Sequence, residues 1–264
     1  MEHAKDVTKY WDSPLPRIFA HRGLGLQHPE NSLEAFQHAL AFDTGYLETD
    51  IQASADGIAV VTHDADFRHL AGISRRVNSM NWDEIDQIRL AQGERILSLE
   101  DLLEALPHAR LNIDVKDAGA IADTARAIQR AAAQHRVLIS SFSTKRRLKT
   151  LQALSALGYS GTVATSAASA EVLLALLGAK LHLLWLMKFA LRRVDAVQIP
   201  VSILRIRLDS AAMIHAFHRA CVEVHFWTIN DTKQMSALLA NGADGIVTDR
   251  CDLAMKLIQK PNRE

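Results

Sequence analysis

In two separate apolar runs of the sequence, an acidic residue is followed two positions later by another charged residue. Glu48 and Asp50 form one such pair, and Asp114 is followed at the same interval by Lys116. Because alternate residues of a strand point to the same side, each pair projects from one face of its strand. Each carboxylate by itself has an ordinary explanation as a solvated charge or an ion pair. Three that converge need a neutralising cation, and oxygen ligands favour Mg²⁺, Ca²⁺ or Mn²⁺ over zinc.

Two histidines end other strand-like runs, His21 the first of them and His63 a later one. The pKa of histidine lies nearest neutrality, so two imidazoles on opposite sides of a phosphorus atom can act as base and acid. Arg22 and Lys116 supply positive charge that can hold phosphate oxygens, or they can be counter-ions of the carboxylates. The other ten of the twelve histidines fall in helical or loop contexts, which are typical of surface or structural residues.

These polar residues occur where apolar, β-branched runs end, and the runs alternate with segments of helical periodicity. Such alternation predicts right-handed βαβ units and a parallel sheet, so the predicted fold class is α/β. Eight units suit a TIM (β/α)8 barrel, whose active site lies at the carboxyl ends of the strands. A doubly wound open sheet is the competitor, but no Gly-x-Gly-x-x-Gly follows the first strand. The expected barrel strands are 17–23, 46–53, 111–116, 137–142, 161–165, 195–199, 223–229 and 245–248.

Two segments depart from this alternation. The run 58–64 extends the second strand, and a polar stretch of about 65–97 follows it as a small insertion on one barrel rim. Long connections in compact domains are usually lids or binding loops. We expect residues 1–16 to form an N-terminal extension and residues 17–260 to form a single barrel domain, because no linker divides the sequence.

The composition is that of an ordinary globular protein. Of 264 residues, 48% are hydrophobic, and 30 Lys and Arg balance 30 Asp and Glu. Zero net charge excludes a bulk attraction to nucleic acid or to an anionic membrane, so a phosphate must be recognised locally. Two cysteines favour a reducing, cytoplasmic location over a disulfide framework. The N-terminal residues lack signal-peptide character, and charges interrupt the apolar stretch 172–191 too often for it to span a membrane.

In their order and spacing, these residues resemble the opening signature of the glycerophosphodiester phosphodiesterase family. The opening motifs are His21-Arg22-Gly23, Pro29-Glu30-Asn31-Ser32, Ala35-Phe36, Glu48-Thr49-Asp50, Asp56-Gly57 and His63-Asp64. The later motifs are Leu111 to Lys116, Ser140 to Ser143, Trp227 to Asp231 and Gly242 to Arg250. The resemblance therefore extends from about residue 17 to residue 258.

The resemblance implies a TIM-barrel enzyme that uses Mg²⁺ or Ca²⁺ to cleave a glycerophosphodiester to sn-glycerol 3-phosphate and an alcohol. By analogy, the substrate's 2-hydroxyl attacks phosphorus, and the resulting cyclic phosphate is hydrolysed. The roles implied by position are an acid/base pair of His21 and His63, metal ligands Glu48, Asp50 and Asp114, phosphate-binding residues Arg22 and Lys116, rim residues Glu30 and Asn31, and a glycerol-pocket wall at Trp227. The family usually has Glu at the position of Asp114, so this ligand is one methylene shorter here.

Other interpretations remain open. A lysophospholipase D-type activity on membrane lysolipids would use the stretch 172–191 as an interfacial helix, with Trp185 at headgroup depth. The plainer interpretation of that stretch is an outer barrel helix with an extra turn, or an oligomer contact. A non-catalytic barrel that binds phosphodiesters is another alternative, against which the presence of both histidines argues. A zinc amidohydrolase is disfavoured because the ligand set lacks histidine.

Overall fold

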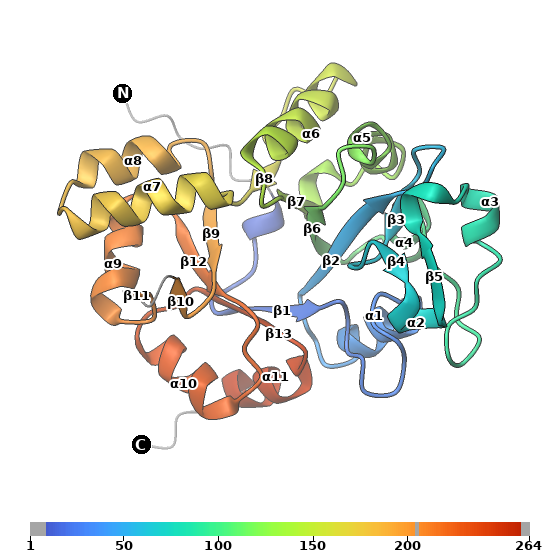
Figure 1. The fold of residues 1–264 in the computed structure, drawn as a ribbon. Helices are drawn as coiled ribbons and strands as arrows, with labels where there is room; N and C mark the ends of the chain where they lie inside the picture. Colours follow the sequence, from blue (N-terminus) through green and yellow to red (C-terminus); the bar gives the residue numbers. More distant parts are fainter. Residues whose placement is uncertain (1–8, 204–205, 260–264) are drawn as a thin grey trace.

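The computed structural model of the chain describes residues 9–203 and 206–259. Within these residues, eight parallel strands follow one another around a barrel in the order β8-β7-β6-β2-β1-β13-β12-β9 (Figure 1). A single parallel bridge between Ser166 and Ala196 joins the two ends of this series. The strands are β1 Arg17–His21, β2 Tyr46–Ala53, β6 Arg110–Val115, β7 Val137–Ser140, β8 Ala164–Thr165, β9 Ala196–Ile199, β12 Glu223–Phe226 and β13 Gly245–Thr248. The predicted α/β barrel is confirmed.

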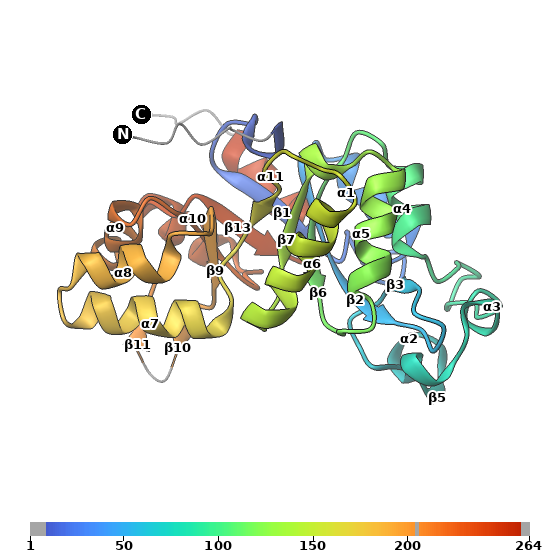
Figure 2. The ribbon, with the colours of Figure 1, turned by 90° about the horizontal axis from the view of Figure 1, so that it is seen from above.

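Helices surround the strands on the outside, as both ribbon views show (Figures 1 and 2). They are α1 Leu33–Leu40, α4 Leu99–Ala105, α5 Ile121–Arg130, α6 Thr144–Ala156, α7 Ser169–Lys180, α8 Leu184–Leu191, α9 Ala211–Arg219, α10 Thr232–Ala240 and α11 Cys251–Gln259, with a short 3-10 turn η3 at Gln134–Arg136. Several begin at a side chain that accepts a hydrogen bond from the first turn: Ser32, Ser98, Ser143, Ser210 and Asp231. Such N-caps satisfy backbone N–H groups that the helix itself leaves unpaired, which fixes where each helix starts. A small hairpin, β10 Ser202–Ile203 with β11 Ile206–Arg207, follows β9.

The segment after β2 folds as a small unit beside the barrel. Strand β3 (Ala59–Val61) pairs antiparallel with β2, and the chain continues through β4 (Asp66–Phe67), α2 (Arg68–Ala71), β5 (Ile73–Arg76), η2 (Val77–Ser79) and α3 (Trp82–Ile85). This stretch reads as polar in the sequence, yet it contains its own buried cluster of Val60, Phe67, Val77, Met80, Ile85, Ile88, Leu90 and Ile96. Burial of these apolar side chains offsets the entropy cost of ordering the segment. The predicted polar insertion is therefore a packed unit.

The apolar stretch 172–191 is not one continuous helix, contrary to the sequence-based expectation. It is divided between α7 and α8, which pack as an antiparallel hairpin (Figure 2). The chain reverses at His182, whose φ of 55° is left-handed, and the N–H of Leu183 donates to the carbonyl of Gly178 at 2.8 Å. A Cβ on Gly178 would lie 2.9 Å from Cγ of Met187, so glycine allows the two helices to approach closely. No helix in the described part of the chain is long and apolar enough to cross a membrane.

The predicted N-terminal extension, 1–16, falls outside the described residues at positions 1–8, and so does residue 260 at the end of the predicted domain. From residue 9 the chain forms the short turn η1 (Lys9–Trp11), where Tyr10 is fully buried. The backbone carbonyl of Tyr10 accepts a hydrogen bond from the hydroxyl of Tyr46 at 2.7 Å, and its ring packs against Tyr46 and Phe19 in one cluster. The turn therefore packs against the amino-terminal parts of β1 and β2, away from the strand ends that carry the predicted site.

Candidate active site

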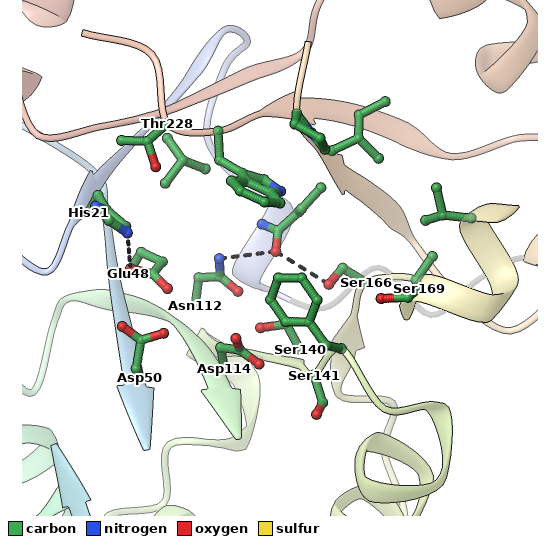
Figure 3. A pocket seen from close by; sticks show the side chains of 18 of the residues that line it. His21, Glu48, Asp50, Asn112, Asp114, Ser140, Ser141, Ser166, Ser169 and Thr228 are labelled. Carbon is green, nitrogen blue, oxygen red and sulfur yellow. Dashed lines mark hydrogen bonds and ion pairs between the residues drawn. The ribbon is translucent and has the colours of Figure 1, made fainter. Parts of the chain in front are cut away.

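The strand register brings the predicted acidic residues and His21 next to one another. In the pairing of β1 with β2, His21 lies opposite Glu48, and in the pairing of β2 with β6, Asp50 lies opposite Asp114. Glu48 and Asp50 are two apart on β2 and therefore face the same way, toward the barrel interior (Figure 3). All three carboxylates are at least nine-tenths buried. The prediction that these side chains converge at the carboxyl ends of neighbouring strands holds in the structure.

Two basic side chains are interleaved with the carboxylates. Nζ of Lys116 lies 2.9 Å from Oδ1 of Asp50 and 2.7 Å from Oδ2 of Asp114, so the ammonium group bridges the two acids. Nε of Arg22 lies 3.1 Å from Oδ2 of Asp50, and its Nη1 lies 3.0 Å from Glu30. Burial acts to lower the pKa of Lys116, but the charges of Asp50 and Asp114 outweigh it and the pKa is raised. Lys116 is therefore firmly cationic in this arrangement.

Glu48 has the poorest compensation of the three acids. Its Oε2 lies 3.8 Å from Nε2 of His21, which is too far for a hydrogen bond, and this oxygen is buried. Burial and, after it, the neighbouring charge of Asp50 raise its pKa from the ordinary 4.5 to about 8. Glu48 therefore keeps its proton near neutral pH unless a further positive charge binds beside it.

His21 is oriented by a carboxylate from the last barrel strand. Oδ1 of Asp249, directly after β13, lies 2.6 Å from Nδ1 of His21. The other oxygen of Asp249 accepts from Nδ2 of Asn230 at 2.7 Å, and Oδ1 of Asn230 accepts from Thr248 Oγ1 and the Asp249 N–H. Burial acts to lower the pKa of His21, but the hydrogen bond to Asp249 outweighs it and the pKa is raised. Asn230 thus holds Asp249, and Asp249 holds the imidazole.

The chain turns sharply after β1, which places Arg22 beside Asp50. Arg22 has a φ of 56° and Gly23 one of 84°, and both values are left-handed. A Cβ on Gly23 would meet the carbonyl carbon of Ala35 at 2.7 Å, so only glycine fits between the turn and helix α1. The His21-Arg22-Gly23 motif is thus explained by a histidine at the strand end, a cation over the acids and a residue without a side chain.

His63 follows the extension β3 and lines the same pocket as His21. Its Nδ1 lies 2.8 Å from Oδ1 of Asp64, and its backbone carbonyl accepts from Nε2 of Gln52 at 2.8 Å. The second hydrogen bond ties the end of the extension back to β2. With Nδ1 engaged by a carboxylate in each histidine, Nε2 is the nitrogen left for proton transfer.

The pocket around these residues has a volume of about 370 Å³ and a lining of two unlike parts. Its polar lining contains His21, His63, the three carboxylates and the two cations, together with Asn112, Gln198 and Ser166. Figure 3 shows His21 and the carboxylates beside Asn112 and Ser166. Nδ2 of Asn112 donates to Oε1 of Gln198 at 3.2 Å, and Ser166 Oγ lies 3.3 Å from the same oxygen. The apolar part of the lining is formed by Phe142, Val172, Leu173, Ile199, Pro200, Ile203 and Trp227. It adjoins the charged part at Phe142, whose ring centroid lies 5.2 Å from Nζ of Lys116.

Two predicted rim residues lie outside this lining. Glu30 forms an ion pair with Arg22, which positions the guanidinium from the side away from Asp50. Asn31 is buried, has a φ of 60°, and accepts a hydrogen bond from Oγ1 of Thr49 at 2.8 Å. Since Thr49 stands between Glu48 and Asp50 on β2, Asn31 braces the strand that carries both acids. Trp227 lines the pocket, and its role as the wall of a glycerol site stays a prediction.

The donor set suits a hard divalent cation in composition, although the acids are not gathered as chelating ligands. Glu48 Oε2 and Asp114 Oδ1 are buried oxygens without a hydrogen-bond donor, and Asp50 Oδ2 has only the ion pair with Arg22. Carboxylate oxygens are the ligands that Mg²⁺ and Ca²⁺ prefer. Among the described residues, no three His, Cys, Asp or Glu side chains are arranged to hold a metal ion. The ammonium of Lys116 occupies the space between Asp50 and Asp114. Metal binding would therefore require Lys116 to move aside.

Sequence reasoning assigned no role to several polar residues of the site. Asp249 directly follows β13, and Asn230 lies in the loop after β12, both inside motifs that supported the family resemblance. Their place at the carboxyl ends of barrel strands was the available signal. Asn112 and Gln198 face the barrel interior from positions within strands, where a polar side chain is unusual and indicates a polar lumen.

Comparisons with known proteins point to one family. The chain matches the family described as "Glycerophosphoryl diester phosphodiesterase family" over residues 21–253. It is 39% identical over 239 residues to a probable glycerophosphodiester phosphodiesterase 2 of Mycobacterium tuberculosis, covering 89% of this chain and 87% of that protein. It is also 32% identical over 115 residues to a lysophospholipase D of Rattus norvegicus, which covers 39% of this chain and 37% of that protein.

Solved structures with a similar fold carry related names. A glycerophosphodiester phosphodiesterase from Agrobacterium tumefaciens superimposes with a TM-score of 0.73 at 22% identity, covering 93% of this chain and all of that one. An Oleispira antarctica phosphodiesterase, in complex with the product sn-glycerol-3-phosphate, has a TM-score of 0.71 at 23% identity, with 93% of this chain and 98% of that one covered. These likenesses support the barrel architecture.

Proposed function

Since the chain belongs to the glycerophosphoryl diester phosphodiesterase family, we propose that its pocket cleaves a glycerophosphodiester to sn-glycerol 3-phosphate and an alcohol. One observation carries the proposal: two histidines, each with a carboxylate on Nδ1, line the same pocket as three buried acids and two cations. The likeness to a structure that holds sn-glycerol-3-phosphate supports the same substrate class.

A divalent cation, Mg²⁺ or Ca²⁺, belongs to this proposal. Glu48, Asp50 and Asp114 would hold it, and when bound it would supply a Lewis acid that stabilises charge on a phosphoryl oxygen. The buried oxygens without donors and the raised pKa of Glu48 support a cation at this position. In its ion pairs with Asp50 and Asp114, the ammonium of Lys116 compensates the two acids. If the ammonium were displaced from these pairs, it would be free to contact a phosphate oxygen.

The two histidines would divide the proton transfers between them. One imidazole would take the proton from the substrate's 2-hydroxyl as its oxygen attacks phosphorus. The other would give a proton to the departing alkoxide as the bond between phosphorus and that oxygen breaks. Water would then open the cyclic phosphate to the monoester, and the histidine roles would reverse. A glycerophosphodiester analogue without the 2-hydroxyl should be inert, and its rapid cleavage would overturn the cyclic route alone.

The test is release of glycerol 3-phosphate from glycerophosphocholine, with and without EDTA, by the wild type and by His63→Ala. We expect EDTA to abolish release, and His63→Ala to lower kcat by roughly 10²- to 10⁴-fold, the usual contribution of a general acid or base. His108→Ala is a matched control, because that histidine is exposed and lies outside the pocket lining. Absence of metal-dependent release from any glycerophosphodiester would overturn the proposal and favour a barrel that only binds phosphodiesters.

A second candidate is a lysophospholipase D-type activity, which the apolar side of the pocket favours. Phe142, Leu173 and Trp227 offer surface to a leaving group more hydrophobic than choline or ethanolamine, and some relatives are named lysophospholipase D. Hydrolysis of lysophosphatidylcholine compared with glycerophosphocholine by kcat/KM would separate the candidates. Peripheral membrane contact through 172–191 would bring such lipids to the pocket. The two free cysteines support a cytoplasmic location for the protein.

A further inference from the structure

The outer side of the α7–α8 hairpin carries a row of exposed apolar side chains. Their exposed fractions are 48% for Leu173, 48% for Leu177, 53% for Leu181, 65% for Trp185 and 53% for Phe189. Leu173 and Leu177 stand four apart in α7, as Trp185 and Phe189 do in α8, and Leu181 lies at the turn between the helices. Leu176, Met187 and Leu191 of the same helices are buried. Apolar residues scattered singly over a surface are ordinary, but five large ones on one hairpin indicate an interaction surface.

Basic side chains border this row. Lys180, Lys188, Arg192 and Arg193 are exposed, and the sequence has no acidic residue between Glu171 and Asp195. The guanidinium of Arg192 lies over the ring of Phe189 at 4.1 Å from its centroid, so cation and aromatic share one side of α8. The zero net charge of the whole chain thus conceals a locally positive, apolar face. Aromatic and basic groups together are what the headgroup region of an anionic bilayer accommodates.

The row begins at the pocket itself. Leu173 lines the pocket and is also about half exposed, and Phe142, 56% exposed, lines the same pocket. A surface that contacts the row would therefore come to lie next to the pocket mouth. The insertion that carries β4, β5 and α3 lies on the other side of the barrel, so it does not cover this face (Figures 1 and 2).

We propose that the α7–α8 hairpin docks the protein on an anionic lipid surface and presents the apolar wall of the pocket to lysolipids there. The inference rests on the proposed function, because it specifies where that site meets its substrate. A second copy of the chain is the rival occupant. A two-fold contact would bring the basic groups of one copy against those of the other without acidic partners, which is unfavourable.

The test is co-sedimentation with vesicles of phosphatidylcholine alone and of phosphatidylcholine with phosphatidylserine. We expect binding to the anionic vesicles that falls as salt is raised. The double variants Trp185→Ala/Phe189→Ala and Lys188→Ser/Arg192→Ser should each weaken binding about tenfold or more. The control Leu148→Ala/Lys149→Ser removes an exposed leucine and an exposed lysine from α6 and should bind like the wild type.

Hydrolysis of water-soluble glycerophosphocholine separates this inference from the proposed function. None of the substituted hairpin residues lines the pocket, so the hairpin variants should hydrolyse this substrate like the wild type. Unchanged turnover with lost vesicle binding supports the docking surface. Loss of all turnover in the wild type would count against the proposed function alone. Absence of vesicle binding, equal binding by hairpin and control variants, or a dimer in light scattering that the hairpin variants disperse would each overturn the docking surface.

Discussion

Oδ1 of Asp249 lies 2.6 Å from Nδ1 of His21, although the two residues are 228 positions apart in the sequence. Burial acts to raise the pKa of Asp249, but the hydrogen bonds from His21 and Asn230 lower it overall. An ionised carboxylate can only accept hydrogen bonds, so Nδ1 of His21 carries a proton. Nε2, on the side of Glu48, is then the nitrogen that exchanges protons with a substrate.

Replacing Asp249 should therefore impair catalysis without removing the imidazole. We expect Asp249→Asn to lower kcat by roughly 10- to 100-fold, as second-layer partners of active-site histidines commonly do. Loss of the negative charge should also lower the pKa of His21, so the acidic limb of the pH–rate profile should move to lower pH. Asp252→Asn is the control, since Asp252 pairs with Arg250 and lies outside the pocket lining. Equal rates and profiles for both variants would contradict the role of Asp249.

The stability of the metal-free protein should depend on pH through Glu48. Its pKa rises from 4.5 to about 8 on folding because it is buried, so the folded state binds more protons than the unfolded state between these values. The resulting stability is full below the unfolded pKa and is lost as pH rises toward 8. In EDTA, Tm of the wild type should fall from pH 5 to 8 relative to Glu48→Gln. Saturating divalent cation should remove that fall, and parallel Tm curves in EDTA would refute the assignment.

Lys116 should stabilise the metal-free pocket. In Lys116→Met, the carboxylates of Asp50 and Asp114 lose the ammonium that bridges them. We expect the free energy of unfolding in EDTA to fall by about 2 kcal/mol, less than for a fully buried pair because a fifth of the lysine side chain is exposed. Urea unfolding measures the change, and Lys149→Met on α6 gives the background for an exposed lysine. A fall no larger than that of Lys149→Met would mean that the bridge contributes nothing.

Gly23→Ala should damage the turn that holds Arg22. The added methyl group would meet the carbonyl carbon of Ala35 at 2.7 Å, in a residue whose φ is 84°. We expect a loss of roughly 1–3 kcal/mol of unfolding free energy together with a lower kcat, because Arg22 shifts relative to Asp50. Gly72→Ala is the comparison: its φ of 71° is also left-handed, but a methyl group there would meet nothing within 4 Å. Equal losses for the two variants would assign the effect to backbone strain alone.

The sequence allowed the carboxylate cluster to be predicted because its geometry is local. Residues two apart on a strand share a face, and adjacent parallel strands end together, so Glu48, Asp50 and Asp114 converge once the strands are identified. The role of Asp249 was out of reach, because nothing local links it to His21. The break at His182 was missed since apolar periodicity continues through the turn between α7 and α8. In the insertion, scattered apolar residues within a polar stretch concealed a folded unit.

The insertion packs around a cluster of its own, but it reaches the pocket through a segment that β2 holds in place. His21 belongs to the barrel core, whereas His63 follows β3, and Val60 of β3 packs into the cluster of the insertion. The Thr62 N–H donates to the carbonyl of Asp50 at 3.0 Å, and Nε2 of Gln52 donates to the carbonyl of His63 at 2.8 Å, so His63 is fixed to the strand that carries two of the acids. Sequence changes farther along the insertion can therefore reshape the rim of the pocket while the two imidazoles keep their places beside the charged residues.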